Sequence, residues 1–399
     1  MNRLSLVWLA LCSATTPTHA YSQELPFLNR SIKEMEAWVR EDTNDSQRQY
    51  YLALAHWKHQ DWRQTDSLLR LTIQLDPRFA DAYLALGFLP YARRTSLADE
   101  EIRHNVPKDW KPIVEEAERF YKRAFRTDPL VSLSVMAIVN GLEEPRVSDF
   151  TPSGWLVYQR CCAWYFDLGL GRYRLASERL TKLAQREFDE AKHPEQVPDF
   201  LLNYRGLAEA HTLQYDAAIA DFRALLDRTL KQAQRDEIVH VPLEDNDYRF
   251  ILARLHQLAG HTDSAIARYQ ESLEHDLGLV MAHTYLATVY DESGRAADAM
   301  LERHRATEVT EDDPTAWFDL AVSLFNTGQT VAADEPLRRA IKLNARFAPP
   351  YYLLGRVTEE LGLPEEAREH YTKFLALAPL RFGDLRGDAE QRLARLTKR

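Results

Sequence analysis

Few side chains of this 399-residue sequence are spaced for metal binding or redox chemistry. His56 and His59 fall one turn apart on an expected helix, but no third ligand follows at a suitable spacing. Cys161 and Cys162 are neighbours, and two thiols are too few for a closed zinc site. A bond between adjacent cysteines needs a strained ring, so we interpret the pair as small apolar residues of a packed helix, with a redox pair as the alternative.

An acidic stretch is the other local feature that could bind a cation. Glu308, Glu311, Asp312 and Asp313 precede Pro314, but their spacing differs from that of a calcium loop, so we interpret them as a solvated turn. The sequence also lacks the zinc-protease His-Glu-x-x-His motif, a phosphate loop, a dinucleotide glycine pattern and a nucleophile elbow. We therefore expect no catalytic residue, no cofactor and no metal site, and a protein that is not an enzyme.

The charge balance is acidic. Sixty acidic residues stand against 50 basic ones, a formal net charge of −10. An acidic surface repels nucleic-acid phosphates and anionic lipid headgroups, so we expect neither as a partner. The length exceeds that of one simple core and suits either several domains or one elongated repeat array.

Residues 1–20 have the pattern of a signal peptide. Arg3 supplies a short basic region, Leu4 to Ala14 is apolar, and Thr18-His19-Ala20 offers a cleavage site between small residues. Eleven apolar residues are too few to cross a bilayer, which needs about 20. We expect an exported protein, periplasmic, envelope-associated or secreted, with no transmembrane span in the mature chain. An uncleaved anchor, a buried first helix and a lipid anchor at Cys12 are the alternatives.

A period of 34 residues organises the second half of the chain. Gly260, Gly294, Gly328 and Gly362 recur at this spacing. Each is preceded at eight residues by a leucine that a small residue follows, and each is followed at five residues by an alanine. A leucine and a small residue let two antiparallel helices approach closely, and a glycine ends the first helix in a left-handed conformation. A single pair leaves an apolar face uncovered, so the pairs must stack.

These positions resemble the tetratricopeptide repeat, a helix pair of 34 residues with aromatic, Leu-Gly, Ala and Pro residues at set places. The last two repeats carry the resemblance best, although Arg303 and Phe374 depart from the family pattern. Their matching residues are Trp317, Leu320, Ala321, Gly328, Ala333 and Leu337, then Tyr351, Leu354, Gly355, Gly362, Ala367, Tyr371 and Pro379.

The first half shows the pattern more loosely. Leu52 and Trp62, Trp164 and Gly171, and Gly206 with Phe222 indicate three repeats. A fourth is split, with its first helix around Gly87 and its second around Tyr121. The resemblance therefore implies an all-α fold, a right-handed α-solenoid of about eight stacked helix-turn-helix units.

The expected organisation has five parts. These are a signal peptide at 1–20, a lead-in helix within 21–45 with a capping box at Ser31 and Glu34, divergent repeats with insertions at 46–245, four regular repeats at 246–381, and a capping helix at 382–399. The insertions are residues 89–112 and 228–247, and an apolar helix at 131–142 fits no repeat.

The resemblance implies a scaffold that binds a protein or peptide segment in a groove lined by the first helices. Family members that grip a chaperone's carboxylate use Lys, Asn and Arg there, whereas this chain has Tyr50 and Leu54, so that activity does not carry over. A structural part of an envelope assembly, using the outer surface, is the alternative, and an enzyme without a known motif is a weaker one. The expected groove residues are Tyr50, Trp57, Phe88, Tyr165, Asn203, Phe250, Arg254, Thr288, Phe318, Asn326, Tyr352 and Arg356, and Trp110 presents the inserted segment.

Overall fold

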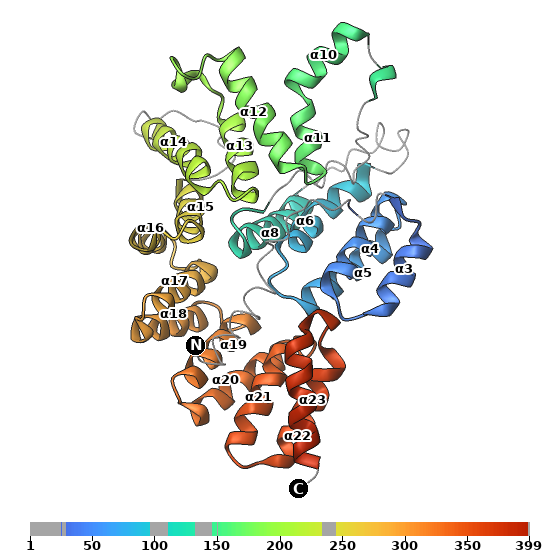
Figure 1. Ribbon diagram of the computed structural model, residues 1–399, viewed down its shortest axis with the longest axis vertical. Coiled ribbons are helices and arrows are strands. Elements are labelled where there is room, and N and C mark those ends of the chain that lie inside the picture. Colours follow the sequence, from blue (N-terminus) through green and yellow to red (C-terminus); the bar gives the residue numbers. More distant parts are fainter. Residues whose placement is uncertain are drawn as a thin grey trace. The chain divides into compact units, whose positions relative to one another are not determined.

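A computed structural model describes residues 25, 29–95, 111–131, 146–149, 151–233 and 245–397. These residues form helices joined by turns, with no strand in any of the described ranges. Figure 1 shows successive helices lying side by side in antiparallel pairs. None of the described helices is long and apolar enough to cross a membrane.

Helices that follow one another form eight pairs in the described chain, which we number repeats 1 to 8. The predicted all-helical fold of about eight helix pairs is confirmed, including the split second repeat. The pairs are α4 (Ser46–Lys58) with α5 (Trp62–Leu75), α6 (Ala80–Thr95) with α8 (Lys111–Thr127), α11 (Ala163–Gly169) with α12 (Tyr173–Glu187), α13 (Asp199–His211) with α14 (Tyr215–Ala233), α15 (Asp245–Leu258) with α16 (Thr262–His275), α17 (Val280–Glu292) with α18 (Ala296–Val309), α19 (Pro314–Asn326) with α20 (Thr330–Leu343), and α21 (Pro349–Glu360) with α22 (Pro364–Leu377).

The repeats divide between two compact units. The terminal unit joins the segment before Thr127 to the segment after Gly278, and holds repeats 1, 2, 6, 7 and 8. The middle unit, within Asp128–Leu277, holds repeats 3, 4 and 5 and also α10 (Pro152–Cys161).

In repeats 2, 4 and 8, an aromatic side chain of the second helix lies directly on a glycine of the first. A Cβ added to Gly355 would lie 2.7 Å from Tyr371 Cε1, and one added to Gly87 would lie 2.6 Å from Tyr121. Such distances are too short for carbon atoms, so only glycine admits the ring. The small residue predicted after each leucine therefore sets how closely the two helices approach.

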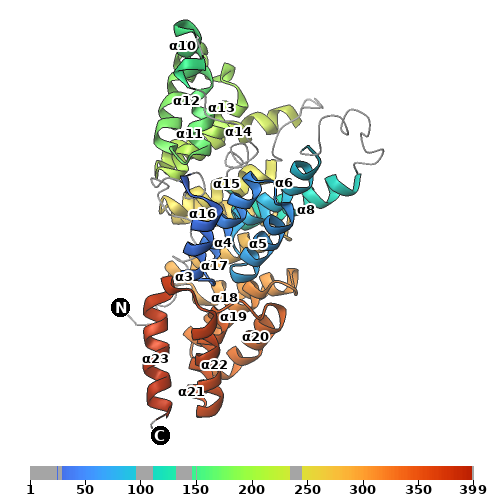
Figure 2. The same cartoon turned by 90° about the vertical axis from the view of Figure 1, so that its right-hand side faces the viewer.

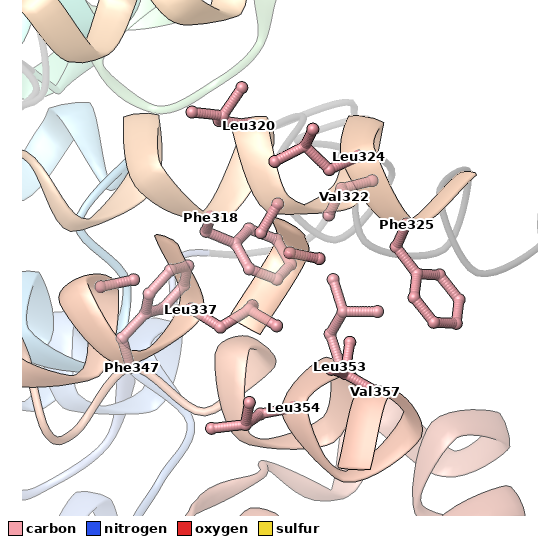
Figure 3. Close-up of a cluster of buried hydrophobic side chains, with 13 residues drawn as sticks. Phe318, Leu320, Val322, Leu324, Phe325, Leu337, Phe347, Leu353, Leu354 and Val357 are labelled. Carbon is pink, nitrogen blue, oxygen red and sulfur yellow. The ribbon is translucent and has the colours of Figure 1, made fainter. Parts of the chain in front are cut away.

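Stacking of neighbouring repeats buries the faces that a single pair leaves open. Figure 3 shows one such core, formed by α19, α20, α21 and the turn between the last two. Phe318 and Phe347 point toward each other, with ring centroids 5.5 Å apart and the planes at 78°. Burying one side chain of this size contributes about 1.5–3 kcal/mol, so the core between repeats is a main source of stability.

The turn inside each regular repeat is left-handed, as predicted. Gly260, Gly294, Gly328 and Gly362 have φ between 75° and 79°. At Gly294 the turn closes with a hydrogen bond from Arg295 N to Tyr290 O of 2.8 Å. Two earlier repeats place a residue with a side chain in the same conformation, Gln60 at φ 59° and Leu213 at φ 63°.

The two departures from the repeat pattern have physical explanations. Arg303 takes the place of an aromatic residue and is buried, and its guanidinium donates to Asp291 Oδ2 at 2.6 Å and to Ser323 Oγ at 3.0 Å. Phe374 replaces a small residue at a position that faces no further repeat, and its ring lies 5.3 Å from that of Tyr352 in the cluster that the last helix closes.

Both ends of the described chain carry an extra helix. Before repeat 1, α3 (Ile32–Glu41) begins with the predicted capping box, in which Ser31 N donates to Glu34 Oε2 at 2.7 Å. After repeat 8, a 3-10 turn (Leu380–Phe382) leads into α23 (Gly383–Thr397), which lies along α22 in Figures 1 and 2. Leu385, Ala389 and Leu396 are its buried residues.

Several sequence predictions fall outside the described residues. These are the signal peptide at 1–20, Trp110 with most of the first insertion, most of the second insertion, and nearly all of the apolar segment 131–142.

The turn geometry predicts opposite effects of small substitutions. Gly294→Ala should lower the free energy of unfolding by about 1 kcal/mol, because a Cβ there meets no neighbouring atom and only the left-handed backbone opposes it. Leu213→Gly should raise it by about 1 kcal/mol, since this exposed leucine has the strained backbone. Urea unfolding of the full chain measures both.

Gly387→Ala is the matched control, because Gly387 lies inside α23 with open space around it. It should raise the free energy of unfolding by about 0.5–1 kcal/mol. A loss at Gly387 equal to that at Gly294 would contradict the assignment of the effect to backbone conformation.

Candidate partner-binding surfaces

Most of the large groove residues predicted from the sequence lie inside the repeats. Phe250, Phe318 and Tyr352 are 0%, 5% and 2% exposed. Their rings pack against aromatic residues, for example Tyr352 against Tyr371 at 6.2 Å. In this conformation these three side chains contribute to the core and offer a partner almost no surface, and their binding role stays a prediction.

The predicted groove residues one or two turns further along the first helices are more accessible. Arg254, Thr288 and Arg356 are half-buried, and Asn326 is exposed. Arg254 Nη1 donates to Gln257 Oε1 at 2.9 Å in the middle unit. Arg356 lies 3.8 Å from Glu360 and stacks over the ring of Phe325 at 5.4 Å, so its methylene stem covers apolar surface while the charge stays near solvent.

The aromatic residues predicted for the early repeats pack mainly on one another. Tyr50 and Trp57 are buried, and Trp57 meets Trp62 edge-on at 5.9 Å. Phe88 is half-buried against Tyr121, and Tyr165 and Asn203 are half-buried as well. Of the predicted set, Tyr165, Asn203, Phe250 and Arg254 lie in the middle unit and the other described members in the terminal unit.

The terminal unit contains a polar seam that the sequence analysis missed, where the turns of the early repeats meet those of the late repeats. Two asparagines at these turns donate to carbonyls at helix ends: Asn44 Nδ2 to Ala376 O at 2.9 Å, and Asn344 Nδ2 to Gln74 O at 2.8 Å. These carbonyls lie in the last turns of α22 and α5, where no intrahelical donor remains for them. Each side of the seam therefore donates one of these hydrogen bonds, Asn44 from the early segment and Asn344 from the late one.

Charged groups extend the seam at its repeat 1 and repeat 8 end. Leu380 N donates to Asp42 Oδ2 at 2.7 Å, and Arg381 Nη2 donates to Ser46 Oγ at 3.0 Å. Arg381 also lies 3.4 Å from Asp45. The seam therefore joins residues more than 300 positions apart in the sequence.

An ion pair between Arg123 and Asp313 anchors the other end of the seam. Arg123 Nη2 donates to Asp313 Oδ2 at 2.7 Å, and Asp313 is 3% exposed. The other carboxylate oxygen accepts from Thr315 N at 2.8 Å and Thr315 Oγ1 at 2.7 Å. Burial acts to raise the pKa of Asp313, but Arg123 and Thr315 outweigh it and hold this pKa below its usual value.

The interpretation of the acidic stretch as a solvated turn is therefore wrong for Asp313, although Glu311 and Asp312 are exposed. The reason is a partner 190 residues away in the sequence. A second ion pair, Arg78 with Asp319, lies in the same seam. The guanidinium of Arg123 also stacks over the ring of Tyr83 at 5.6 Å.

Two cavities flank the Arg123–Asp313 pair, and both are lined by these two residues and Pro77. One measures about 510 Å³, and two cations and two carboxylates line it, with Arg346 and Asp312 among them. The other measures about 310 Å³ and includes three further cations of α8.

A buried acidic network lies in the middle unit. Arg205 holds Asp221 through two hydrogen bonds of 2.7 and 2.6 Å, and reaches Glu190 at 2.7 Å. Glu209 is 7% exposed, and its Oε2 has no hydrogen-bond partner among the described residues. Burial and the nearby Asp221 raise the pKa of Glu209 to about 7. Arg205 thus donates to two of the three carboxyl groups, and Glu209 is the one without a hydrogen bond from it.

A comparison with protein families identifies one of the repeats. A family model described as tetratricopeptide repeat matches residues 348–379, which is repeat 8 and its turn. The C-terminal part of a TPR repeat-containing protein from Cytophaga hutchinsonii is 15% identical, covering 59% of this chain and 87% of that one with a TM-score of 0.46.

Two further solved structures are similar over shorter stretches. A MamA protein is 24% identical, covering 38% of this chain and 90% of that chain with a TM-score of 0.33. A thermophilic TPR protein of Thermus thermophilus is 18% identical, covering 49% and 100% of the two chains with a TM-score of 0.35. No curated protein sequence matches the chain.

Removing Arg123 tests the seam. Arg123→Ala should lower the free energy of unfolding by about 3 kcal/mol, because Asp313 is left buried without its cation. The low pKa of Asp313 stabilises the wild type above pH 4, and this contribution is lost as the pH falls through the lowered pKa; in the variant the loss begins at a higher pH. Urea unfolding at several pH values measures both effects.

The control for that variant is Arg63→Ala, which removes an exposed guanidinium from the same unit. It should change the free energy of unfolding by less than about 0.5 kcal/mol. Equal small effects of the two variants would show that the pair contributes nothing to the seam.

Glu209 predicts a pH dependence of the opposite sign. Its raised pKa means that the folded state holds a proton that the unfolded state releases, so its contribution is complete below pH 4.5 and is lost as the pH rises toward 7. Glu209→Gln should flatten this part of the stability profile and raise stability at pH 8 by roughly 1–3 kcal/mol. Glu178→Gln, at an exposed position in the same unit, should leave the profile unchanged.

Proposed function

We propose that this chain, a tetratricopeptide repeat protein, is a non-enzymatic scaffold that binds a segment of a protein partner along the first helices of its repeats. The observation that carries the proposal is the recurrence of accessible polar side chains on these helices. Thr288 and Arg356 are half-buried and Asn326 is exposed, each on the first helix of a late repeat.

Such positions suit the recognition of an extended segment. The large residues beside them, such as Phe318 and Tyr352, are fixed in the core and hold the helices rigid. Polar side chains on a rigid support can donate to and accept from a partner backbone at little entropic cost. The proposal thus assigns rigidity to the buried residues and contact to the half-buried ones.

A structural role in an envelope assembly is the second candidate. It is supported by exposed apolar residues on the second helices of late repeats, Leu301 at 48% and Val331 at 74%. Single exposed apolar residues are common, so this support is weaker. Export to the periplasm, envelope or outside is proposed for both roles, from the pattern of residues 1–20 alone.

Cross-linked capture tests the binding surface. The purified chain is cross-linked in extracts of its own source cells, and captured proteins are identified by mass spectrometry. Thr288→Arg, Asn326→Arg and Arg356→Glu combined should reduce capture of a specific partner roughly tenfold or more, because they place bulk and reversed charge on the proposed surface. Alanine substitutions at Phe318 or Tyr352 are unsuitable, since the loss of a buried ring costs about 3–5 kcal/mol and would unfold the repeat.

The matched control changes the second helices instead, with Leu301→Arg, Val331→Arg and Arg338→Glu. We expect this variant to capture the partner as the wild type does. The reverse result, capture lost only in the control variant, would contradict binding along the first helices and favour the envelope assembly.

A further inference from the structure

The smaller cavity of the terminal unit has an unusual charge for this protein. Five cationic side chains and one carboxylate line its 310 Å³, in a chain whose formal net charge is −10. The cations come from α8 and from Arg78, and the opposite wall is formed by the residues that lead into α17 and α19. Positive charge is therefore concentrated at one place on an acidic molecule.

Two of the five cations belong to the seam. Arg78 pairs with Asp319, and Arg123 pairs with the buried Asp313. Arg78, Arg123 and Asp313 line the cavity, whereas Asp319 does not.

The other three cations lie on one side of α8. Arg119, Lys122 and Arg126 are spaced at i, i+3 and i+7, so they project from one face of the helix, and all three are exposed. Lys122 contacts Glu118 at 2.7 Å, but both side chains are more than half exposed. A surface pair of this kind is worth at most about 1 kcal/mol and yields readily to a better acceptor.

The lining residue Asp313 shows how groups of this cavity bind a carboxylate. Asp313 accepts from a guanidinium, a backbone N–H and a hydroxyl, all between 2.7 and 2.8 Å. The opposite wall also includes Val280 and Met281, which form the first turn of the 13-residue helix α17. No side chain caps this turn, and the positive end of the helix dipole lies there.

Apolar groups complete the lining. Pro77, Val280 and Met281 also line the cavity, but all three are buried and present little surface. Three exposed cations spread over two turns of α8 suit several carboxylates of one ligand, which favours an acidic peptide over a bare anion. A nucleic acid is disfavoured, because the rest of the acidic chain would repel a phosphate backbone.

We propose that this cavity binds an acidic segment of a protein partner, with its carboxylates on Arg119, Lys122 and Arg126. The inference rests on the proposed scaffold function and adds the chemical class of the partner. Its cations lie on α8, the second helix of repeat 2, and not at Thr288, Asn326 or Arg356, so the two claims can fail separately.

Fluorescence anisotropy on the purified full chain tests the site. The probe is a labelled octapeptide, Gly-Leu-Glu-Asp-Glu-Asp-Leu-Gly, and its twin carries Gln and Asn in place of the acids. The wild type should prefer the acidic probe roughly tenfold or more. Arg119→Gln, Lys122→Gln and Arg126→Gln combined should abolish the preference, and should flatten its dependence on salt concentration.

The matched control removes three exposed cations elsewhere in the terminal unit, with Lys58→Gln, Arg63→Gln and Lys373→Gln. It changes the net charge equally and should keep the preference within about twofold of the wild type, as expected of a local site. Thermal unfolding verifies that both variants fold.

Three results would overturn the proposal. They are no preference for the acidic probe in the wild type, an equal loss in both triple variants, and binding of a phosphoserine-containing twin roughly tenfold tighter than the acidic probe, which would assign the cavity to phosphopeptides. The capture experiment separates this inference from the scaffold function. If the wild type and the triple α8 variant capture a partner equally, the scaffold function is supported and the acidic-peptide site is rejected. If the wild type prefers the acidic probe but captures no partner, the site is supported and the scaffold function is rejected.

Discussion

The close approach of the two helices in each repeat is the constraint on which the structure depends. Where a tyrosine or phenylalanine of the second helix must lie on the first, as Tyr371 lies on Gly355, a Cβ would overlap the ring. Helices held this closely have little room between them for their other apolar residues, which must be covered by the next repeat, as in the core that joins α19, α20 and α21. Stacking follows from the packing inside the pair, and α23 covers the last exposed face.

This constraint explains why the late repeats could be predicted from the sequence and the early ones only in outline. A left-handed turn ends each first helix, and a glycine at that place is visible as a period. Gln60 and Leu213 adopt the same backbone conformation, but their residue types do not predict it. The surrounding helices impose the conformation there. The split repeat was found through Gly87 and Tyr121, whose contact is the same one that forms repeat 8.

Side-chain accessibility was harder to predict than the helices. A residue on the inner face of a first helix has the same spacing whether it lines a groove or fills the space between repeats. The structure separates Phe318, which packs on Phe347, from Asn326, which is exposed. No local sequence pattern predicts the Arg123–Asp313 pair, because its two residues are 190 positions apart. Taken separately, the acidic turn and the basic helix end each resemble a solvated surface.

The seam accounts for one of the cations on α8. A buried carboxylate such as Asp313 must be neutralised, and the guanidinium that does so has to come from the facing helix. One arginine on α8 suffices for that purpose, and Arg78 serves Asp319 from the neighbouring turn. Three further cations line the cavity beyond these two pairs, Arg119, Lys122 and Arg126. The chain as a whole has a net charge of −10 and repels anions, and this cluster lowers that repulsion locally for a negatively charged group that approaches it. The packing that closes the terminal unit thus requires only two of the five cations that line the cavity, and an anionic ligand would account for the other three.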